Sequence, residues 1–82
     1  MNINLVSFGS FYVSFDIESV NDEIMIVASI IRNGIVLHKV HKLTYKGKGN
    51  CELISLLLDR TVASLVADDV IRTAINIGVE LV

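Results

Sequence analysis

The chain has 82 residues, 52% of them apolar, and a formal net charge of −2 at pH 7. This length predicts one domain over residues 1–82, and the small net charge excludes a global field that attracts nucleic acid. A chain this short buries only about 60–65% of its unfolded surface, so part of its apolar surface stays exposed in a single copy. We therefore expect a homo-oligomer, most simply a two-fold dimer.

Cys51 is the only cysteine, which excludes an internal disulfide and predicts a reducing compartment. The first fifteen residues lack a basic segment and are interrupted by polar side chains, so we expect no signal peptide. No apolar run approaches the ~20 residues that a transmembrane helix needs. The protein is therefore predicted to be soluble and cytoplasmic.

Residues 11–17 alternate strictly between apolar and polar side chains, which predicts a half-buried strand. Asp16 lies in this strand, where a carboxylate requires a partner. Residues 2–8 are also strand-like. Gly9-Ser10 between them predicts either a hairpin turn with Gly first or a bulge within one long strand, and the sequence leaves this choice open.

A polar turn is expected over residues 18–22, followed by a β-branched, nearly continuous apolar run at 23–32 that predicts a strand covered on both faces. Asn33-Gly34 predicts a type I′ hairpin, so residues 35–45 form the antiparallel return strand. Lysine and histidine side chains along this strand are typical of an exposed sheet edge.

The second half of the chain predicts two helices and two short strands. Asn50 suits an N-cap, and the apolar spacing that follows predicts a helix over 50–60. Residues 61–67 are expected to form a short buried strand. Asp68-Asp69 would then cap a helix over 70–77, with Gly78 at its C′ position and a last strand at 79–82. An alternative is one helix over 50–67.

The predicted order is β-β-β-α-β-α-β, an α/β (α+β mixed-sheet) domain with an antiparallel meander followed by a right-handed parallel crossover. This order resembles the ribonuclease H-like fold over residues 11–82. The resemblance is strongest at three short motifs, each of which carries an acidic residue in the corresponding place of ribonucleases H: Phe15-Asp16, Asn50-Cys51-Glu52-Leu53 and Ala67-Asp68-Asp69.

The resemblance implies metal-ligand and catalytic roles for Asp16, Glu52 and Asp68, with Asp69 as the substitute for Asp68. Clustered carboxylates repel one another unless a cation bridges them. Oxygen ligands suit Mg²⁺ or Mn²⁺, and two such ions could support hydrolysis of a phosphodiester. Helix capping alone accounts for Glu52 and Asp68, so Asp16 is the residue on which this hypothesis depends.

The end of the chain, residues 74–82, is similar to the end of the dinitrogenase iron-molybdenum cofactor biosynthesis family, a branch of the same fold without a nuclease site. Cluster binding would fall to Cys51, His38 or His41, although the two histidines are three residues apart on one strand and should face opposite sides. Cys51 suits a space-filling role. The one basic stretch is a candidate for nucleic-acid binding, through Lys39, Lys42, Lys46 and Lys48.

The favoured function is therefore a small binding or assembly module without catalysis, held as a homodimer by apolar surface and without a bound organic cofactor. The alternative is a divalent-metal nuclease-like domain that uses Asp16, Glu52 and Asp68. The two hypotheses differ in where the carboxylate of Asp16 points, toward the starts of the helices or toward solvent.

Overall fold

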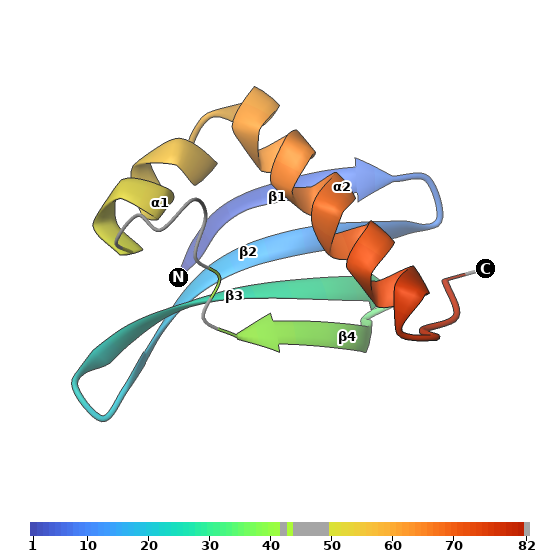
Figure 1. Cartoon of the computed structure of the whole chain (residues 1–82), viewed down its shortest axis with the longest axis horizontal. Coiled ribbons are helices and arrows are strands. Elements are labelled where there is room, and N and C mark those ends of the chain that lie inside the picture. The colour runs from blue at the N-terminus through green and yellow to red at the C-terminus, as the bar shows by residue number, and fades with distance from the viewer. Residues whose placement is uncertain (42, 44–49, 82) are drawn as a thin grey trace.

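Four strands form one antiparallel sheet, and two helices pack on one of its faces, in the computed structural model (Figure 1). The structure describes residues 1–41, 43 and 50–81, with the backbone alone for Val20 and Asn50. The elements follow in chain order, and the strands are neighbours in that same order across the sheet: β1 (Asn2–Phe8), β2 (Phe11–Val20), β3 (Glu23–Arg32), β4 (Ile35–His41), α1 (Asn50–Leu57) and α2 (Arg60–Asn76).

Two of the hairpins turn on pairs of residues in the left-handed region. Asn33 and Gly34 have φ of 51° and 76°, which confirms the predicted type I′ turn. Asn21 and Asp22 have φ of 51° and 64°, so β2 and β3 are also joined by a two-residue turn. The expected turn over 18–22 is therefore too long, because β2 continues as a paired strand up to this point.

The first hairpin decides the alternative that the sequence leaves open. β1 pairs antiparallel with β2, and Gly9 has a φ of 69° in the turn between them. Residues 2–8 are therefore a separate strand, and its pairing shifts register between Asn2 and Asn4. The predicted edge position of β4 is confirmed. β4 ends at His41, and of the remaining predicted strand residues, 42, 44 and 45 lie outside the described residues.

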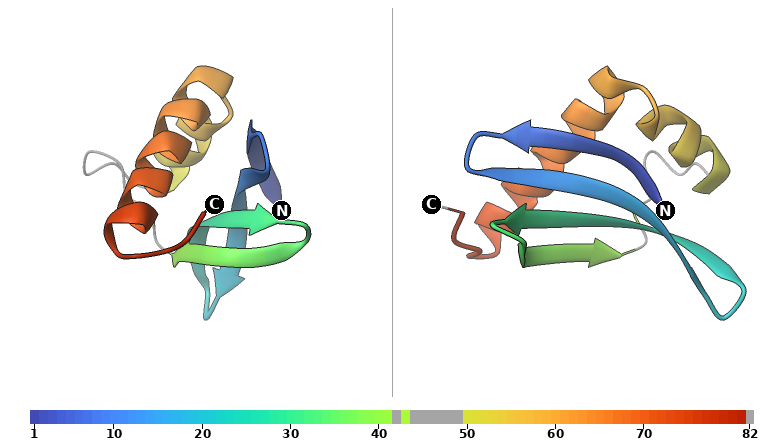
Figure 2. Two further views of the ribbon diagram at one scale, coloured as in Figure 1. Left: turned by 90° about the vertical axis from the view of Figure 1, so that its right-hand side faces the viewer. Right: turned by 180° about the vertical axis from the view of Figure 1, so that it is seen from behind.

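The core lies between the sheet and the helices, which cover the same face (Figure 2). β2 contributes Val13 and Phe15, and their neighbours on β3 are Ile26, Ala28 and Ile30; all five side chains are fully buried. Burial of each large apolar side chain contributes about 1.5–3 kcal/mol. The helices complete the core with aliphatic side chains on their inner faces: Leu53, Leu57, Ala63, Val66, Ala67, Val70, Ile71 and Ala74.

Residues 61–67 are helical, and the predicted strand there is wrong. Ala63, Val66 and Ala67 are buried and continue without a break into the buried positions of the following turns. This spacing is that of one helical stripe. The helix begins after Asp59, whose Oδ1 accepts hydrogen bonds from the N–H groups of Thr61 (2.8 Å) and Val62 (3.2 Å). Asp59 is therefore the N-cap, and Asp68 and Asp69 lie within the helix.

The observed order is β-β-β-β-α-α, and the predicted ribonuclease H-like order with a parallel crossover is not found. All three strand pairs are antiparallel, because the segment that was to supply a parallel strand belongs to α2. Residues 79–81 form no strand. Gly78 follows the C-cap Ile77 with a φ of 92°, which confirms its predicted place after a helix. The fold is a two-layer α+β arrangement.

Candidate functional site

The face of the sheet opposite the helices has no covering layer in the part of the chain that the structure describes, and we call it the open face (Figure 2). The strand register defines the residues that share it. Asp16 lies between Asn2 of β1 and Val27 of β3, and His41 follows on β4. The open face is therefore built from all four strands, and Asp16 lies on β2 within it.

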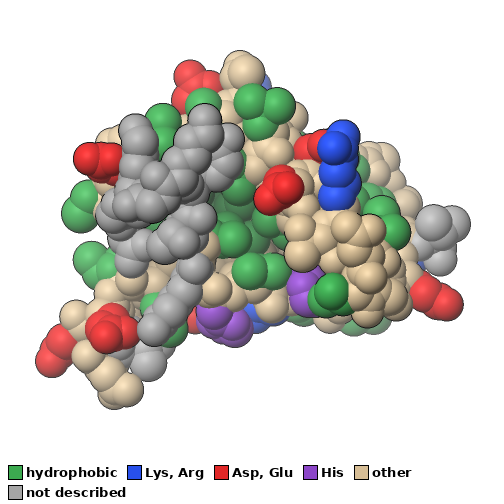
Figure 3. All heavy atoms as spheres, in the orientation of Figure 1, with side chains coloured by type: hydrophobic (Ala, Val, Ile, Leu, Met, Phe, Trp, Pro, Cys, Tyr) green, Lys and Arg blue, Asp and Glu red, His purple; other side chains and the backbone are tan. Residues whose placement is uncertain are grey.

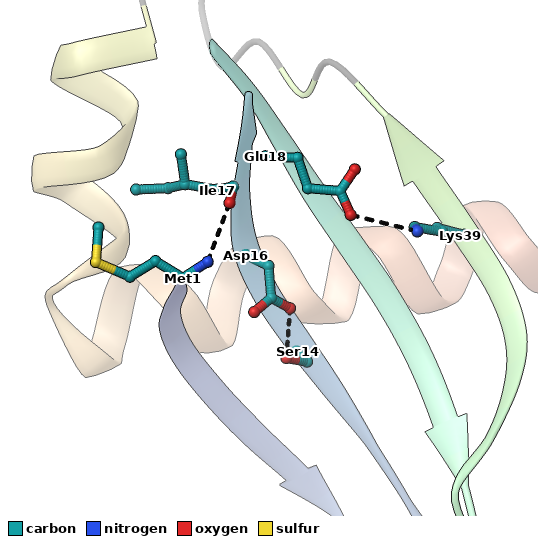
Figure 4. Close-up of polar contacts among 6 residues, drawn as sticks. All are labelled: Met1, Ser14, Asp16, Ile17, Glu18 and Lys39. Carbon is teal, nitrogen blue, oxygen red and sulfur yellow. Dashed lines mark hydrogen bonds and ion pairs between the residues drawn. The ribbon is translucent and has the colours of Figure 1, made fainter. Parts of the chain in front are cut away.

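Asp16 belongs to a hydrogen-bonded polar cluster on this face (Figure 4). The Ser14 hydroxyl donates to Oδ2 of Asp16 at 2.8 Å. Nδ2 of Asn2 donates to the Ser14 Oγ at 2.8 Å and to Oδ1 of Asp16 at 3.3 Å. Both carboxylate oxygens thus have neutral donors, which stabilise a partly buried charge without a cation. The partners expected for Asp16 are therefore Ser14 and Asn2, which lie beside it in the sheet.

The predicted metal-binding and catalytic trio is not brought together. Asp16 lies on the open face, whereas Glu52 lies in the first turn of α1 and Asp68 in the middle of α2, on the other side of the sheet. Asp68 pairs with Arg72 at 3.0 Å instead. Within residues 1–41, 43 and 50–81, no three His, Cys, Asp or Glu side chains are grouped so that they could hold a metal ion. The three predicted ligands therefore do not converge on one point of the structure.

Only one of the four lysines proposed for nucleic-acid binding can be placed. Lys39 lies opposite Ser29 on the open face, and its Nζ forms an ion pair with Glu18 at 3.4 Å (Figure 4). About two fifths of each side chain is exposed, so the pair is worth at most about 1 kcal/mol. Lys42, Lys46 and Lys48 lie outside the described residues.

The candidate cluster ligands are also separated. His38 pairs with Ile30, on the helix side of the sheet, and His41 pairs with Val27, on the open face, so the predicted opposite orientation is confirmed. Cys51 is exposed at the start of α1, and the space-filling role expected for it is wrong. It lines a shallow surface hollow with three neighbours of the same helix.

An apolar strip crosses one end of the open face. Tyr12, Ile31 and Val36 are direct cross-strand neighbours on β2, β3 and β4, and Leu5 of β1 lies diagonally beside Tyr12. Leu5 and Val36 are 45% and 52% exposed. We call these four residues the apolar strip. The helix layer also carries exposed apolar side chains, Leu65 and Ile75 among them, and Figure 3 shows hydrophobic side chains at several places on that side.

A cleft lies between the outer edge of β1 and the first turns of α2, and we call it the edge cleft. Its volume is about 420 Å³, and four consecutive strand residues and two helix residues line it: Asn4, Leu5, Val6, Ser7, Arg60 and Ser64. Sequence reasoning named none of them as site residues. The available signal was the absence of any charged residue from 2–8, since edge strands usually carry charges.

Comparison of the chain with protein-family models, curated proteins and solved structures found no match. The resemblance to ribonucleases H therefore remains a prediction. Among the described residues, neither helix is long and apolar enough to cross a membrane.

Proposed function

We propose that this protein is a non-catalytic binding and assembly module that forms a homodimer through the open face of its sheet. The observation that carries the proposal is the apolar strip, which joins side chains of all four strands on an uncovered face. Contiguous apolar patches of this kind mark interaction surfaces, whereas apolar residues scattered singly do not.

A second copy of the chain is the occupant that the composition favours. The chain is 52% apolar and has a net charge of only −2, so two copies repel each other weakly. Four strands spaced ~4.8 Å apart and at least seven residues long make a face of about 19 Å by 24 Å, or about 450 Å² in projection. This projected area is a little over half of the ~800 Å² that each partner buries in a standard interface.

Light scattering on matched variants tests the proposal. Val36 of the apolar strip and Ile75 on the helix layer are similarly exposed, at 52% and 56%, so glutamate is tolerated at either site. The wild-type chain should have twice the 9.0 kDa mass of one copy at micromolar concentration. Val36→Glu should give monomers because it places a charge in the interface, and Ile75→Glu should stay dimeric.

Two results would contradict the proposal. A wild-type mass of 9.0 kDa at every concentration would exclude the homodimer. Equal behaviour of the Val36→Glu and Ile75→Glu variants would place the contact elsewhere than on the open face. Circular dichroism on both variants verifies that the fold is kept.

A further inference from the structure

The outer edge of β1 presents backbone groups that the sheet does not use. β1 is the first strand in the sheet order and has a neighbour on one side only. In a two-residue hairpin the flanking residues, here Phe8 and Phe11, exchange backbone hydrogen bonds. Alternate residues then turn toward the neighbour, so Leu5 and Ser7 direct their N–H and C=O groups outward.

The hydrogen bonds of this segment agree with that assignment. The N–H of Leu5 donates to Oδ1 of its neighbour Asn4 at 2.9 Å, and Nδ2 of Asn4 donates to the carbonyl of Leu57 at 3.0 Å. The Asn4 side chain thus already occupies the outward N–H of Leu5. The outward N–H and C=O of Ser7 have no such hydrogen bond among the described residues, and Ser7 is one of the residues that line the edge cleft.

The two edges of the sheet are built differently. β4 carries Lys39 and two histidines, and the β3–β4 pairing shifts register at Ile30/Ile31. Charges and bulges of this kind prevent another strand from pairing. β1 has no charged residue, and its pairing is regular from Asn4 onward. Strand addition is therefore blocked at β4 and open at β1.

The helix layer turns this open edge into a cleft. The start of α2 extends beyond β1 in Figure 1, one layer above the sheet in Figure 2, so a strand placed beside β1 would lie beneath Arg60 and Ser64. Among the described residues, Arg60 is the only one with a charged side chain that lines the cleft. It has no ion pair among the described residues, and the nearby Asp59 carboxylate is engaged by the helix N–H groups.

We infer that the edge cleft binds an extended acidic peptide segment of a partner protein, which adds to β1 as a fifth strand with a carboxylate facing Arg60. Backbone hydrogen bonds supply affinity in this mode, and side-chain pockets supply specificity. A peptide is favoured over a second copy because a second β1 would bring its own α2 into the same layer. Leu5 belongs to both surfaces, but strand addition uses outward backbone groups in the plane of the sheet, so it does not require the homodimer.

Synthetic peptides provide the probe. The lead is a fluorescent peptide about nine residues long, with alternating Thr and Val and a central Glu, which covers the seven residues of β1. Anisotropy should show saturable binding, and the amide signal of Ser7 should shift in the NMR spectrum. A peptide with Gln in place of Glu should bind about three- to fivefold more weakly, as expected for a partly exposed ion pair.

Backbone methylation of the peptide tests strand addition without altering the protein. N-methyl groups on every second residue remove the donors that face either β1 or solvent, depending on which set is methylated. One set should weaken binding more than tenfold, since several hydrogen bonds are lost, and the other should leave it nearly unchanged. Equal effects of the two sets would overturn the inference.

Protein variants test the residues of the cleft. Ser7→Pro removes the outward N–H and should abolish binding, while the β1–β2 pairing does not use that donor. Arg60→Glu should reverse the binding preference, so that a matched Lys peptide binds more tightly than the Glu peptide. Arg72→Gln on the same helix is the control and should leave the affinity for both peptides unchanged. Absence of saturable binding, or peptide-induced shifts confined to the open face, would overturn the inference. So would protection of the Ser7 amide that rises with protein concentration in the Val36→Glu variant, because a second copy would then occupy the cleft without the open-face contact.

Discussion

Replacement of Asp59 by alanine should destabilise the protein, because this side chain caps the long helix. Its Oδ1 accepts two backbone N–H groups at 2.8 and 3.2 Å. Loss of an N-cap costs about 1 kcal/mol, and loss of a negative charge at the helix N-terminus costs a further 0.3–1 kcal/mol or so. A total of about 1.5 kcal/mol corresponds to a fall in Tm of roughly 6–12 °C for a chain of this length.

Asp69→Ala is the matched control, since it removes the same carboxylate from the interior of α2. Alanine is the better helix former there by about 0.5 kcal/mol, so this variant should be as stable as the wild type or slightly more so. Thermal unfolding followed by circular dichroism measures both. If Asp69→Ala lowers the Tm and Asp59→Ala does not, the helix begins after Asp69 and the structural assignment of residues 61–67 is refuted.

Three further predictions concern the core, Asp16 and Cys51. Ile30→Val should lower the free energy of unfolding by about 0.5–1.5 kcal/mol because Ile30 is fully buried, and Ile75→Val at an exposed position should change it by less than about 0.5 kcal/mol; urea titration compares them. Millimolar Mn²⁺ should leave the Tm unchanged, and an increase that Asp16→Asn abolishes would restore the metal-site hypothesis. Cys51 should react with a chromogenic disulfide reagent as readily in the folded chain as in urea, because it is exposed; protection until unfolding would contradict its placement.

Local chemistry allowed the first half of the fold to be predicted from sequence. Asn33-Gly34 tolerates the positive φ values of a type I′ turn, and the alternation of residues 11–17 matches a strand with one buried face. Lysine and histidine marked β4 as an edge. Each of these features depends on residues close together in the chain, so no knowledge of tertiary contacts was needed.

The second half failed where two local signals competed. Asp68-Asp69 has the composition of a helix cap, and this divided one helical stripe at its middle. The buried stripe from Ala63 to Ala74 becomes evident only when the residues before and after Asp68-Asp69 are considered as one helix. Asp59 was the true cap, but it lay inside a predicted helix. Whether an aspartate caps a helix depends on the backbone around it, which composition alone does not determine.

The alternation of residues 11–17 already indicated that Asp16 would not meet Glu52 and Asp68. Asp16 follows Phe15, and successive side chains of a strand point to opposite faces. Phe15 is fully buried beneath the helices, so Asp16 must face away from them and cannot meet Glu52 or Asp68. The resemblance to ribonucleases H required the three carboxylates to converge, and the alternating faces of the strand exclude this. The edge cleft, in contrast, needs the packing of α2 over β1, which no pattern within β1 reveals.

The dilution of isotopically labelled protein from millimolar to micromolar concentration, followed through its backbone amide NMR signals, tests the proposed homodimer and its surface together. Dimerisation through the open face predicts concentration-dependent shifts at the amides of Tyr12, Ile31 and Val36, with the outer face of α2 unchanged. Spectra that do not change with concentration, or changes confined to α2, would contradict the account.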